Sequence, residues 1–445
     1  MTAAARVCVV GAGVAGCAAA LAARANGADV AIVEGPYGAS AMSTGAWDVA
    51  PLEGMDGPWR TGRTVGEAIE AVVRDRPHHP YARRAGTTAA GRRALLAEIA
   101  AAHGALFGAL GIYRPFDLGS HGVLVATEAG VARRAASAQI AVLDLDEAGT
   151  SDEARVVAVA ELRGYRAFDA PSIAASLGQD ATRRGDARRF LATPLEFFRR
   201  RSDATLGPAE VAALLDGDEA RRRFAAILRR DVTVEGLSAV LVPPVLGRET
   251  DDVPAKLASA LGVPMGEALG GPGGPQGLRL HRRIEAALDA AKVVRIEGPA
   301  VRVVVRGDGV SVETGSGSVA ADRVVLATGS LLGGGLVLSD GELREPLLDL
   351  PVGVRGEPLA LPSSARGRDP VALLGAELHA GGLGSSAGVR VDASMRVIDR
   401  DETPMARVLA AGALLADHDP TRDGTGLGVA TLTGWVAGAT AARPG

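Results

Sequence analysis

The chain has 445 residues, of which 47% are hydrophobic and 22% are charged, so it is long enough to bury a large core and too apolar to be disordered. Its formal net charge of −4 and its 3% aromatic content argue against nucleic acid as the main partner. Its two cysteines, Cys8 and Cys17, are too few for an iron–sulfur cluster, which takes about four thiolates.

The first 35 residues read as a strand, a glycine turn, a helix and a second strand. The apolar run Val7–Val10 predicts a buried parallel strand. Three glycines follow it with the spacing G-x-G-x-x-G: Gly11, Gly13 and Gly16. Ala15–Ala25 consists of helix-forming residues, and Val30–Val33 predicts a second strand that ends in Glu34. This order of elements is typical of a dinucleotide-binding unit.

Each residue of this motif has a physical role in such a unit. Gly11 permits the tight turn out of the strand, Gly13 lets the backbone approach a pyrophosphate, and Gly16 lets the helix pack closely on the strand. The helix N-terminus offers N–H groups and a positive dipole end to the phosphates. Glu34 can accept hydrogen bonds from both ribose hydroxyls and would repel a 2′-phosphate. We therefore expect the ADP portion of FAD or NAD here, rather than NADP.

Two segments downstream favour FAD over NAD, because an NAD dehydrogenase would not need them. After a short turn, the second strand is followed by Ser40, Ser43, Thr44 and Gly45. This Ser/Gly-rich stretch resembles the one that runs along the pyrophosphate towards the flavin ring in the glutathione-reductase-like FAD fold. Far downstream, an apolar strand ends in Ala327, Thr328 and Gly329, which resembles the second signature of that fold.

A third segment lies near the C-terminus. The apolar strand Val408–Ala411 is followed by Gly412, Asp419, Gly426 and Gly428. This order resembles the third signature of the fold, with an acidic residue near the ribitol and then the helix Val429–Ala442. The N-terminus of that helix would stabilise negative charge on a reduced flavin. The uncharged stretch Gly426–Ala442 is short for a membrane span and rich in Gly and Thr, so we expect a packed helix instead.

The predicted fold is α/β: a Rossmann-like FAD-binding domain of the glutathione-reductase type with an inserted α+β domain. We assign residues 1–50, 276–350 and 386–445 to the flavin domain and 51–275 to an insertion for substrate or interface contacts. Residues 351–385 form a connection that could belong to the insertion. Within the insertion, helical and strand patterns alternate, for example Gly91–Leu106, Ala154–Leu162 and Pro208–Arg230. A further helix is predicted at Leu278–Ala291.

Several segments together resemble a known family, the B subunit of the anaerobic glycerol-3-phosphate dehydrogenase, along most of the chain. The most specific is Val325–Pro346, VLATGSLLGGGLVLSDGELREP. The others are Ser40–Asp48, Gly164–Leu177 (GYRAFDAPSIAASL), Leu241–Gly247 (LVPPVLG), Gly412–Pro420 and Gly424–Gly428. The segment after Gly412 departs from the family by carrying charges where the family is richer in glycine.

The resemblance implies a flavoprotein that works with two partners, a catalytic flavoprotein (the A subunit) and an iron–sulfur protein (the C subunit). Such a complex oxidises sn-glycerol 3-phosphate and passes electrons to quinone. The family often carries FMN in the B subunit, whereas Glu34 favours FAD, so FMN is the alternative cofactor. We expect a cytoplasmic protein without direct membrane insertion, associated with the membrane through a partner subunit.

A dehydrogenase of a secondary alcohol needs a proton acceptor and cations for a phosphate. His418 lies between the Gly412 and Gly426 segments, so it is the first candidate for the acceptor, and Arg344 in the family-like segment is a candidate for holding an anion. His78 and His79 lack further ligands at zinc spacing, so we predict no metal site. Two alternatives stay open: a self-contained FAD-dependent reductase or oxidase of a small carboxylate, and a non-catalytic electron-transfer or scaffold subunit.

Overall fold

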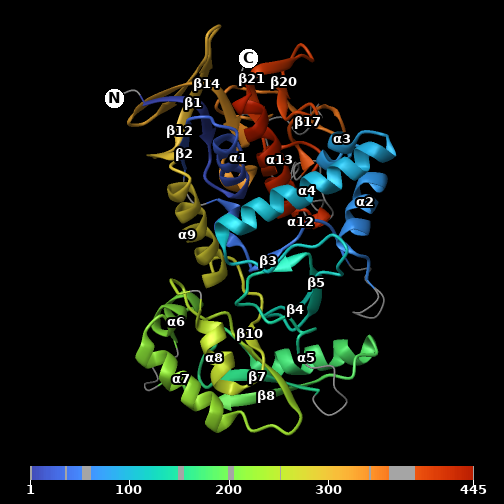
Figure 1. The fold of residues 1–445 in the computed structure, drawn as a ribbon, viewed down its shortest axis with the longest axis vertical. Coiled ribbons are helices and arrows are strands. Elements are labelled where there is room, and N and C mark those ends of the chain that lie inside the picture. Colours follow the sequence, from blue (N-terminus) through green and yellow to red (C-terminus); the bar gives the residue numbers. More distant parts are fainter. Residues whose placement is uncertain are drawn as a thin grey trace.

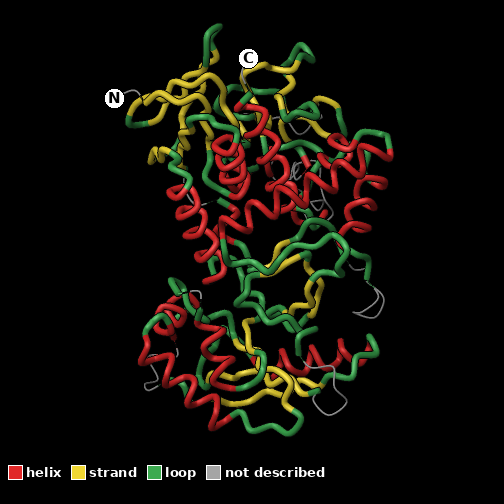
Figure 2. Tube along the Cα trace, viewed as in Figure 1, coloured by secondary structure: helices red, strands yellow, loops and turns green. Residues whose placement is uncertain are grey.

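The computed structural model describes the chain except for residues 1–2, 36–37, 53–61, 149–154, 199–204, 251, 340–341, 360–385 and 444–445. It forms two α/β units that lie one above the other along the long axis of the molecule (Figure 1). Figure 2 shows the strands gathered mainly towards the two ends, with helices between them. The predicted connection 351–385 lies largely outside the described residues.

The first unit is built on a mixed sheet whose centre is parallel. The parallel strands are β11 (Val294–Glu297), β2 (Val30–Glu34), β1 (Ala3–Val10), β14 (Gly317–Leu326) and β21 (Pro404–Ala410), in that spatial order. Antiparallel strands extend it: β12 (Ala300–Val305) and β13 (Val310–Thr314) beside β14, and β20 (Arg396–Ile398) beside β21. The first half of β14 therefore belongs to a meander and its second half to the parallel centre. This sheet confirms the predicted Rossmann-like domain.

Two helices that are far apart in sequence pack closely on this sheet. α1 (Val14–Ala25) is almost entirely small residues, and α13 (Gly426–Ala442) lies against it (Figure 1). A Cβ on Gly434 would overlap the carbonyl group of Ala15, and one on Gly438 would overlap that of Ala19. The uncharged C-terminal stretch is thus a packed core helix, as predicted, although it begins at Gly426 rather than at residue 429.

Residues 65–113 belong to the core of the first unit, and not to the insertion in which the sequence placed them. They form α2 (Val65–Asp75), α3 (Pro80–Ala85) and α4 (Ala89–Leu110). By length and composition alone α4 could cross a bilayer, a test that core helices also pass. Its side chains Leu95, Ile99 and Leu106 are fully buried within the protein. The inserted unit is therefore smaller than the predicted range 51–275.

The second unit has a sheet that is parallel throughout, in the order β10-β9-β7-β8. The strands are β7 (Val156–Leu162), β8 (Arg189–Leu195), β9 (Leu237–Val242) and β10 (Met265–Glu267), and the helices are α5 (Ala170–Arg183), α6 (Pro208–Leu215), α7 (Asp218–Asp231) and α8 (Val253–Leu261). This winding differs from the predicted α+β arrangement. The reason is that β7 and β9 are buried on both faces, as the strands of parallel sheets usually are.

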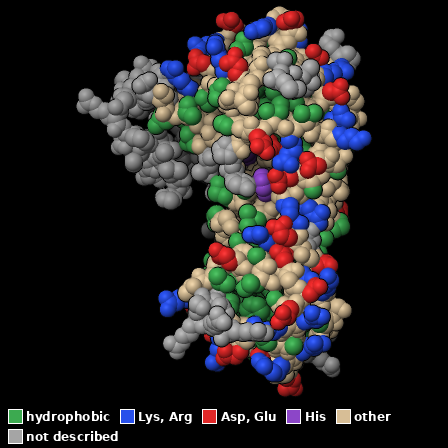
Figure 3. Space-filling model, turned by 90° about the vertical axis from the view of Figure 1, so that its left-hand side faces the viewer, with side chains coloured by type: hydrophobic (Ala, Val, Ile, Leu, Met, Phe, Trp, Pro, Cys, Tyr) green, Lys and Arg blue, Asp and Glu red, His purple; other side chains and the backbone are tan. Residues whose placement is uncertain are grey.

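Short ribbons and one helix join the two units. The ribbons pair β3 (Ala46–Trp47) with β6 (Ser137–Ala138), and β4 (Val123–Ala126) with β5 (Ala132–Ala135). The helix α9 (Pro275–Ala290) returns the chain from β10 to the first sheet (Figure 1). Figure 3 shows the molecule narrowing between the units, and basic and acidic side chains are interspersed over the part of this face that the structure describes.

Candidate cofactor site

The three glycine-containing signature segments meet at one edge of the first sheet. The parallel strands β1, β14 and β21 are neighbours, and their last residues Val10, Leu326 and Ala410 are in register. Backbone hydrogen bonds continue past the strands: the Ala327 N–H donates to the Val10 carbonyl at 2.8 Å, and the Ala411 N–H donates to the Leu326 carbonyl at 2.9 Å. The carboxyl edge of a parallel sheet is where α/β proteins bind their ligands.

Gly11 and Gly16 make the close backbone approaches that the motif predicts. Gly11 has a φ of +104°, and a Cβ there would overlap the carbonyl group of Ala327. A Cβ on Gly16 would overlap the Gly11 carbonyl oxygen and lie 2.9 Å from its carbonyl carbon. These two glycines therefore let the turn pack against the neighbouring strand and helix. Their contacts are within the protein, so they are needed for folding and not only for ligand binding.

Gly13 differs from Gly11 and Gly16 because, among the described residues, only the Ser40 side chain lies within 4 Å of the place that its Cβ would take. A Cβ at this position would meet only the Ser40 hydroxyl oxygen, at 3.0 Å, and the Ser40 Cβ, at 3.9 Å. Gly13 is also the N-cap residue of α1, and it gives the helix no side-chain cap. The Ser40 hydroxyl accepts a hydrogen bond from the Val14 N–H at 3.0 Å. A helix start that lacks an N-cap side chain, with only Ser40 of the described residues beside Gly13, suits the pyrophosphate of a dinucleotide.

Glu34 stands at the end of β2 as predicted, but it has a partner that the sequence did not reveal. Arg295 on the adjacent edge strand β11 binds both carboxylate oxygens of Glu34 through two guanidinium nitrogens: Nε lies 2.5 Å from Oε1, and Nη2 lies 3.2 Å from Oε2. Arg295 Nη2 also donates to Glu285 at 2.6 Å. A carboxylate has about four acceptor positions, so this ion pair leaves room for ribose hydroxyls. Only strand pairing across 261 residues brings this arginine to Glu34.

The segment Ser40–Gly45 is held in place by α9. Ser40 lies in the short 3-10 helix η1 (Ala39–Met42), and a Cβ on Gly277 would overlap the carbonyl group of Ala41. Gly45 has a φ of +99°, and a Cβ there would lie 2.9 Å from Gln276 Cγ. Ser43 and Thr44 are only partly buried. The segment thus presents a partly exposed backbone on a fixed support, which fits a stretch that runs along a bound flavin.

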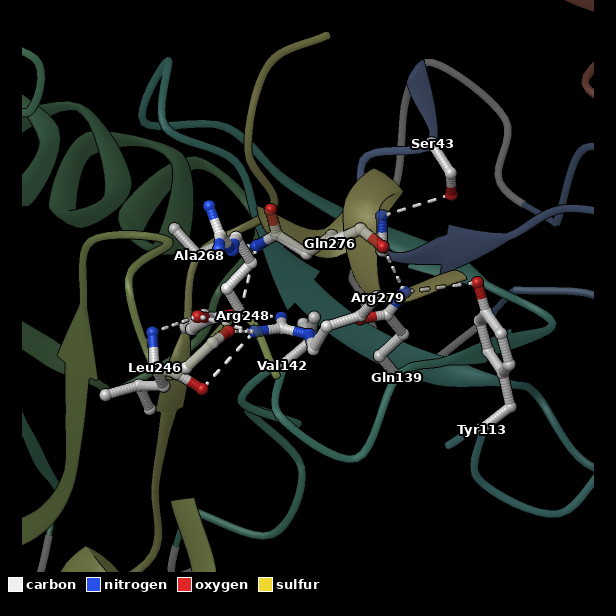
Figure 4. A network of polar contacts seen from close by, with 12 residues as sticks. Ser43, Tyr113, Gln139, Val142, Leu246, Arg248, Ala268, Gln276 and Arg279 are labelled. Carbon is white, nitrogen blue, oxygen red and sulfur yellow. Dashed lines mark hydrogen bonds and ion pairs between the residues drawn. The ribbon is translucent and has the colours of Figure 1, made fainter. Parts of the chain in front are cut away.

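A buried polar network connects this segment to the second unit (Figure 4). The Tyr113 hydroxyl lies near Ser43, and burial raises its pKa to about 12. That hydroxyl accepts from Gln139 Nε2 at 3.3 Å, and Gln139 Oε1 accepts from Arg279 Nε at 3.0 Å. Arg279 Nη2 in turn lies 2.5 Å from the carboxylate of Glu267. Of these residues the sequence pattern indicated only Ser43, because the others are spread over β10, α9 and two loops.

The second signature segment contains a buried polar atom without a partner. Thr328 Oγ1 is buried and makes no hydrogen bond in the described structure. The next residue, Gly329, has a φ of +77°, and a Cβ on Gly335 would overlap its carbonyl group. Such unpartnered buried atoms call for a partner such as a ligand or water. Together with the open side of Gly13, this hydroxyl indicates that the residues present fit a dinucleotide at this edge.

The third signature segment, near the C-terminus, also lies at the carboxyl edge of the first sheet. Gly412 has a φ of +73°, a Cβ there would lie 2.7 Å from Ala15 Cβ, and its N–H donates to Thr433 Oγ1 at 2.9 Å. Gly426 begins α13, and Gly428 follows in its first turn. Asp419 is buried, and its N–H donates to the Asp423 carboxylate at 2.9 Å. The structure therefore brings this segment onto α1, a contact that the sequence analysis did not include.

The two candidate catalytic residues lie in different local clusters. His418 is 1% exposed, and its ring contacts that of His79. Arg344 is half exposed on the strand β16 (Glu342–Arg344), where its guanidinium lies 3.7 Å from Asp349. Among the described residues, no group of three or more potential metal ligands is found. No signal in the sequence indicated that His79 would accompany His418, because the two are more than 300 residues apart.

Comparison with known proteins places this geometry in a family. The family model described as "FAD binding domain" matches residues 6–429. A probable B subunit of the anaerobic glycerol-3-phosphate dehydrogenase from Halobacterium salinarum is 32% identical over 241 residues, which is 52% of this chain and 53% of that protein, so the chain spans about half the length of this relative. The B subunit of the anaerobic glycerol-3-phosphate dehydrogenase from Pectobacterium carotovorum is 25% identical over 439 residues, 96% of each chain.

Solved structures give a weaker likeness. The 3-ketosteroid-Δ4-(5α)-dehydrogenase from Rhodococcus jostii, in complex with 4-androstene-3,17-dione, covers 99% of this chain at 13% identity and a TM-score of 0.41. At these values no functional conclusion follows from the likeness.

Proposed function

The chain belongs to the FAD binding domain family, and from this premise we propose that it is the flavoprotein subunit of an anaerobic glycerol-3-phosphate dehydrogenase-like complex. It is an FAD-binding oxidoreductase. The observation that carries the proposal is the meeting of the three signature segments at the carboxyl ends of β1, β14 and β21. Both relatives are named as B subunits of the anaerobic glycerol-3-phosphate dehydrogenase, and one of them aligns with nearly the whole chain. These names support the choice of this complex.

The chain's own residues can be given roles towards FAD on this proposal. The uncapped start of α1 and the open backbone at Gly13 would receive the pyrophosphate, and Glu34 keeps acceptor positions for ribose hydroxyls. Thr328 Oγ1 would find its missing partner on the dinucleotide. The N-terminus of α13 would face the flavin ring, where its dipole favours negative charge. When bound, FAD supplies a ring that accepts two electrons.

The proposed complex assigns the remaining work to partners. The catalytic flavoprotein, its A subunit, would oxidise the alcohol. The iron–sulfur protein, its C subunit, would carry electrons towards quinone and provide the membrane association. This division is supported by the sequence, whose two cysteines are both buried and free in the structure. His418 and Arg344 remain the candidates for a proton acceptor and an anion-holding residue within this chain.

Identification of the flavin is the first experiment. Acid-released cofactor from the purified protein should run as FAD by chromatography, with FMN and FAD standards alongside. Release of FMN alone would contradict the role given to Glu34, and a colourless protein that takes up no FAD would contradict the proposed function.

Anaerobic mixing with sn-glycerol 3-phosphate tests the division of labour. We expect little or no bleaching of the flavin band with this chain alone, and bleaching once the two partner subunits are added. The enantiomer sn-glycerol 1-phosphate serves as the control. Bleaching within seconds without partners would favour a self-contained enzyme over one part of a complex. With partners present, bleaching no greater than that of the A and C subunits alone would favour the non-catalytic scaffold or a small-carboxylate substrate, and fumarate is then the next compound to add.

A further inference from the structure

A cluster of buried polar side chains lies at the start of α13 and has no part in the function described so far. It consists of His79, Tyr81, His418 and Thr425, which come from the start of α3 and from the loop that precedes α13. All four are at most 1% exposed. The rings of His79 and His418 lie 5.8 Å apart between centroids at an angle of 77°, and the ring of Tyr81 lies 4.9 Å from that of His79.

His79 is fully engaged and is fixed in one tautomer. Its Nδ1 accepts a hydrogen bond from the Tyr81 N–H at 3.2 Å, so Nδ1 carries no proton in the neutral ring. Its Nε2 then carries the proton and donates to Thr425 Oγ1 at 3.3 Å. Thr425 is the N-cap residue of α13, and its side chain makes no capping hydrogen bond to the helix. His79 therefore joins the starts of two helices.

His418 is the opposite case, because neither of its ring nitrogens has a hydrogen-bond partner among the residues that the structure describes. The hydroxyl of Tyr81 is also buried without a partner, and a Cβ on Gly428 would overlap it, so the glycine is needed for this hydroxyl to reach the first turn of α13. Buried polar groups are satisfied in the great majority of cases. The unpartnered atoms of these two side chains, beside the start of α13, are hydrogen-bonding positions that the described residues leave open.

The charges around His418 leave it neutral in the structure as it stands. Burial lowers the pKa of His418 to about 4; the negative charge of Asp419 opposes this shift, and the smaller effect of the positive charge of Arg76 adds to it. Arg76 is itself ion-paired with Asp423 on α12 (Pro420–Asp423). Burial also lowers the pKa of His79, with His418 and Arg76 contributing.

Asp417, next to His418 in the chain, is held by several partners. Asp417 forms an ion pair with Arg83 of α3 and accepts from the backbone N–H groups of Arg355 and Gly356. A negative charge that arrived next to His418 would therefore find a neutral imidazole whose pKa it would raise.

We propose that His418 is the proton-uptake group of the FAD site: it binds one proton when the site gains the negative charge of two-electron reduction, and His79 holds it in position. This inference rests on the proposed placement of the flavin at the start of α13. The two electrons come from an external reductant, one proton accompanies them onto the cofactor, and a second proton moves from solvent to an unpartnered ring nitrogen of His418. In this way the buried site would avoid holding an unbalanced charge.

Nuclear magnetic resonance of the FAD-loaded protein is the direct test, because the chain has only seven histidines. The histidine rings are labelled with nitrogen-15, and spectra are recorded at pH 7 before and after anaerobic reduction with dithionite. We expect one ring to change from the neutral to the doubly protonated form on reduction. That ring should be missing from the spectrum of His418→Gln. If no ring changes, or if the changing ring survives in this variant, the proposal is wrong.

The midpoint potential of FAD gives a second readout. For a two-electron couple each proton taken up shifts the potential by about 30 mV per pH unit, so one additional proton steepens the slope to about 59 mV. Over a pH range that begins above pH 4, we expect the midpoint potential of wild type to follow the slope of about 59 mV per pH unit. In the same pH range His418→Gln should keep the slope of about 30 mV per pH unit. His103→Gln is the matched control, since burial also lowers the pKa of His103 to about 4 and its Nε2 is also unpartnered, but it lies on α4 among aromatic rings.

The outcomes separate this inference from the proposed function. If wild type and His418→Gln give the same potential–pH line while both bind FAD, the inference fails and the function stands. If His103→Gln loses the steeper slope as well, the effect is not specific to His418, and the inference also fails. If wild type binds no FAD, the proposed function fails first. Should His418→Gln not fold, His418→Asn takes its place in the assignment, and wild-type spectra in which no ring becomes protonated on reduction overturn the inference without any variant.

Discussion

Replacing Gly13 and Gly16 separately by alanine should distinguish FAD binding from folding. Gly13 has φ −77° and ψ −172°, an extended conformation that any residue adopts. Among the described residues its Cβ would meet only Ser40, whose hydroxyl at 3.0 Å must shift by a few tenths of an ångström while it bonds the Val14 N–H. Losing glycine at an N-cap costs less than about 1 kcal/mol, and the stiffer unfolded chain offsets part of that. We therefore expect Gly13→Ala to fold with a free energy of unfolding within about 1 kcal/mol of wild type.

FAD affinity should respond very differently. A methyl group at Gly13 would stand beside the start of α1, where the pyrophosphate must approach the backbone. We expect binding to weaken by at least about 100-fold, which corresponds to about 2.8 kcal/mol. Flavin fluorescence titration of the apoprotein measures the affinity, and urea unfolding followed by circular dichroism measures the stability.

Gly16→Ala is the matched variant with the opposite expectation. Its Cβ would overlap the Gly11 carbonyl oxygen, which cannot move away because the Gly11 N–H is bonded to Val33 at 2.9 Å. The cost should exceed about 4 kcal/mol, so little folded protein is expected. The reasoning is refuted if Gly13→Ala binds FAD as tightly as wild type, or if it unfolds to the same extent as Gly16→Ala.

Three further predictions concern stability and reactivity. Glu267→Gln removes the charge that balances the buried Arg279, so the free energy of unfolding should fall by about 3 to 5 kcal/mol, and an unchanged urea midpoint would contradict the assigned pairing. Burial lowers the pKa of His103 to about 4, so on acidification this histidine binds a proton in the unfolded chain before it does so in the folded one. The free energy of unfolding should therefore keep its full value above pH 6.5 and fall by up to about 1.4 kcal/mol per pH unit between pH 6.5 and 4. His103→Gln should make this fall shallower. Burial raises the pKa of Cys8 and Cys17 to about 12, so both thiols should react with a disulfide reagent only after denaturation, and rapid labelling of the native protein would show this burial to be wrong.

Local sequence was sufficient where neighbouring residues fix the conformation. The turn from β1 to α1 follows from Gly11 and Gly16, which no other residue could replace in those backbone positions. The predicted helix at 278–291 is observed as α9 at Pro275–Ala290. The predicted helix at 208–230 is observed as α6 and α7, and it is divided at Gly217, the N-cap of α7. Glycine weakens a helix interior, so Gly217 is a sequence signal for this break within an otherwise continuous helical pattern.

The extent of the inserted unit was not accessible in this way. Residues 65–113 alternate helical and loop patterns as the true insertion does, and nothing in their composition says which sheet they cover. The packing decides it: Trp47 from the first unit is buried among the rings of His103, Phe107 and Tyr113. Likewise, parallel pairing in the second sheet depends on the spatial order of strands that are separated by whole helices.

The amino-acid sequence by itself determined that this protein has a dinucleotide-binding strand, turn and helix, and that two later segments end in turns of the same kind. Only the tertiary structure decided which side chains surround them. Arg295 reaches Glu34 across 261 residues, and His79 reaches Thr425 across 346. The physical reason is that turns and helix starts depend on backbone geometry within a few residues, whereas ion pairs and buried imidazoles depend on strand order and helix packing, which close loops of hundreds of residues.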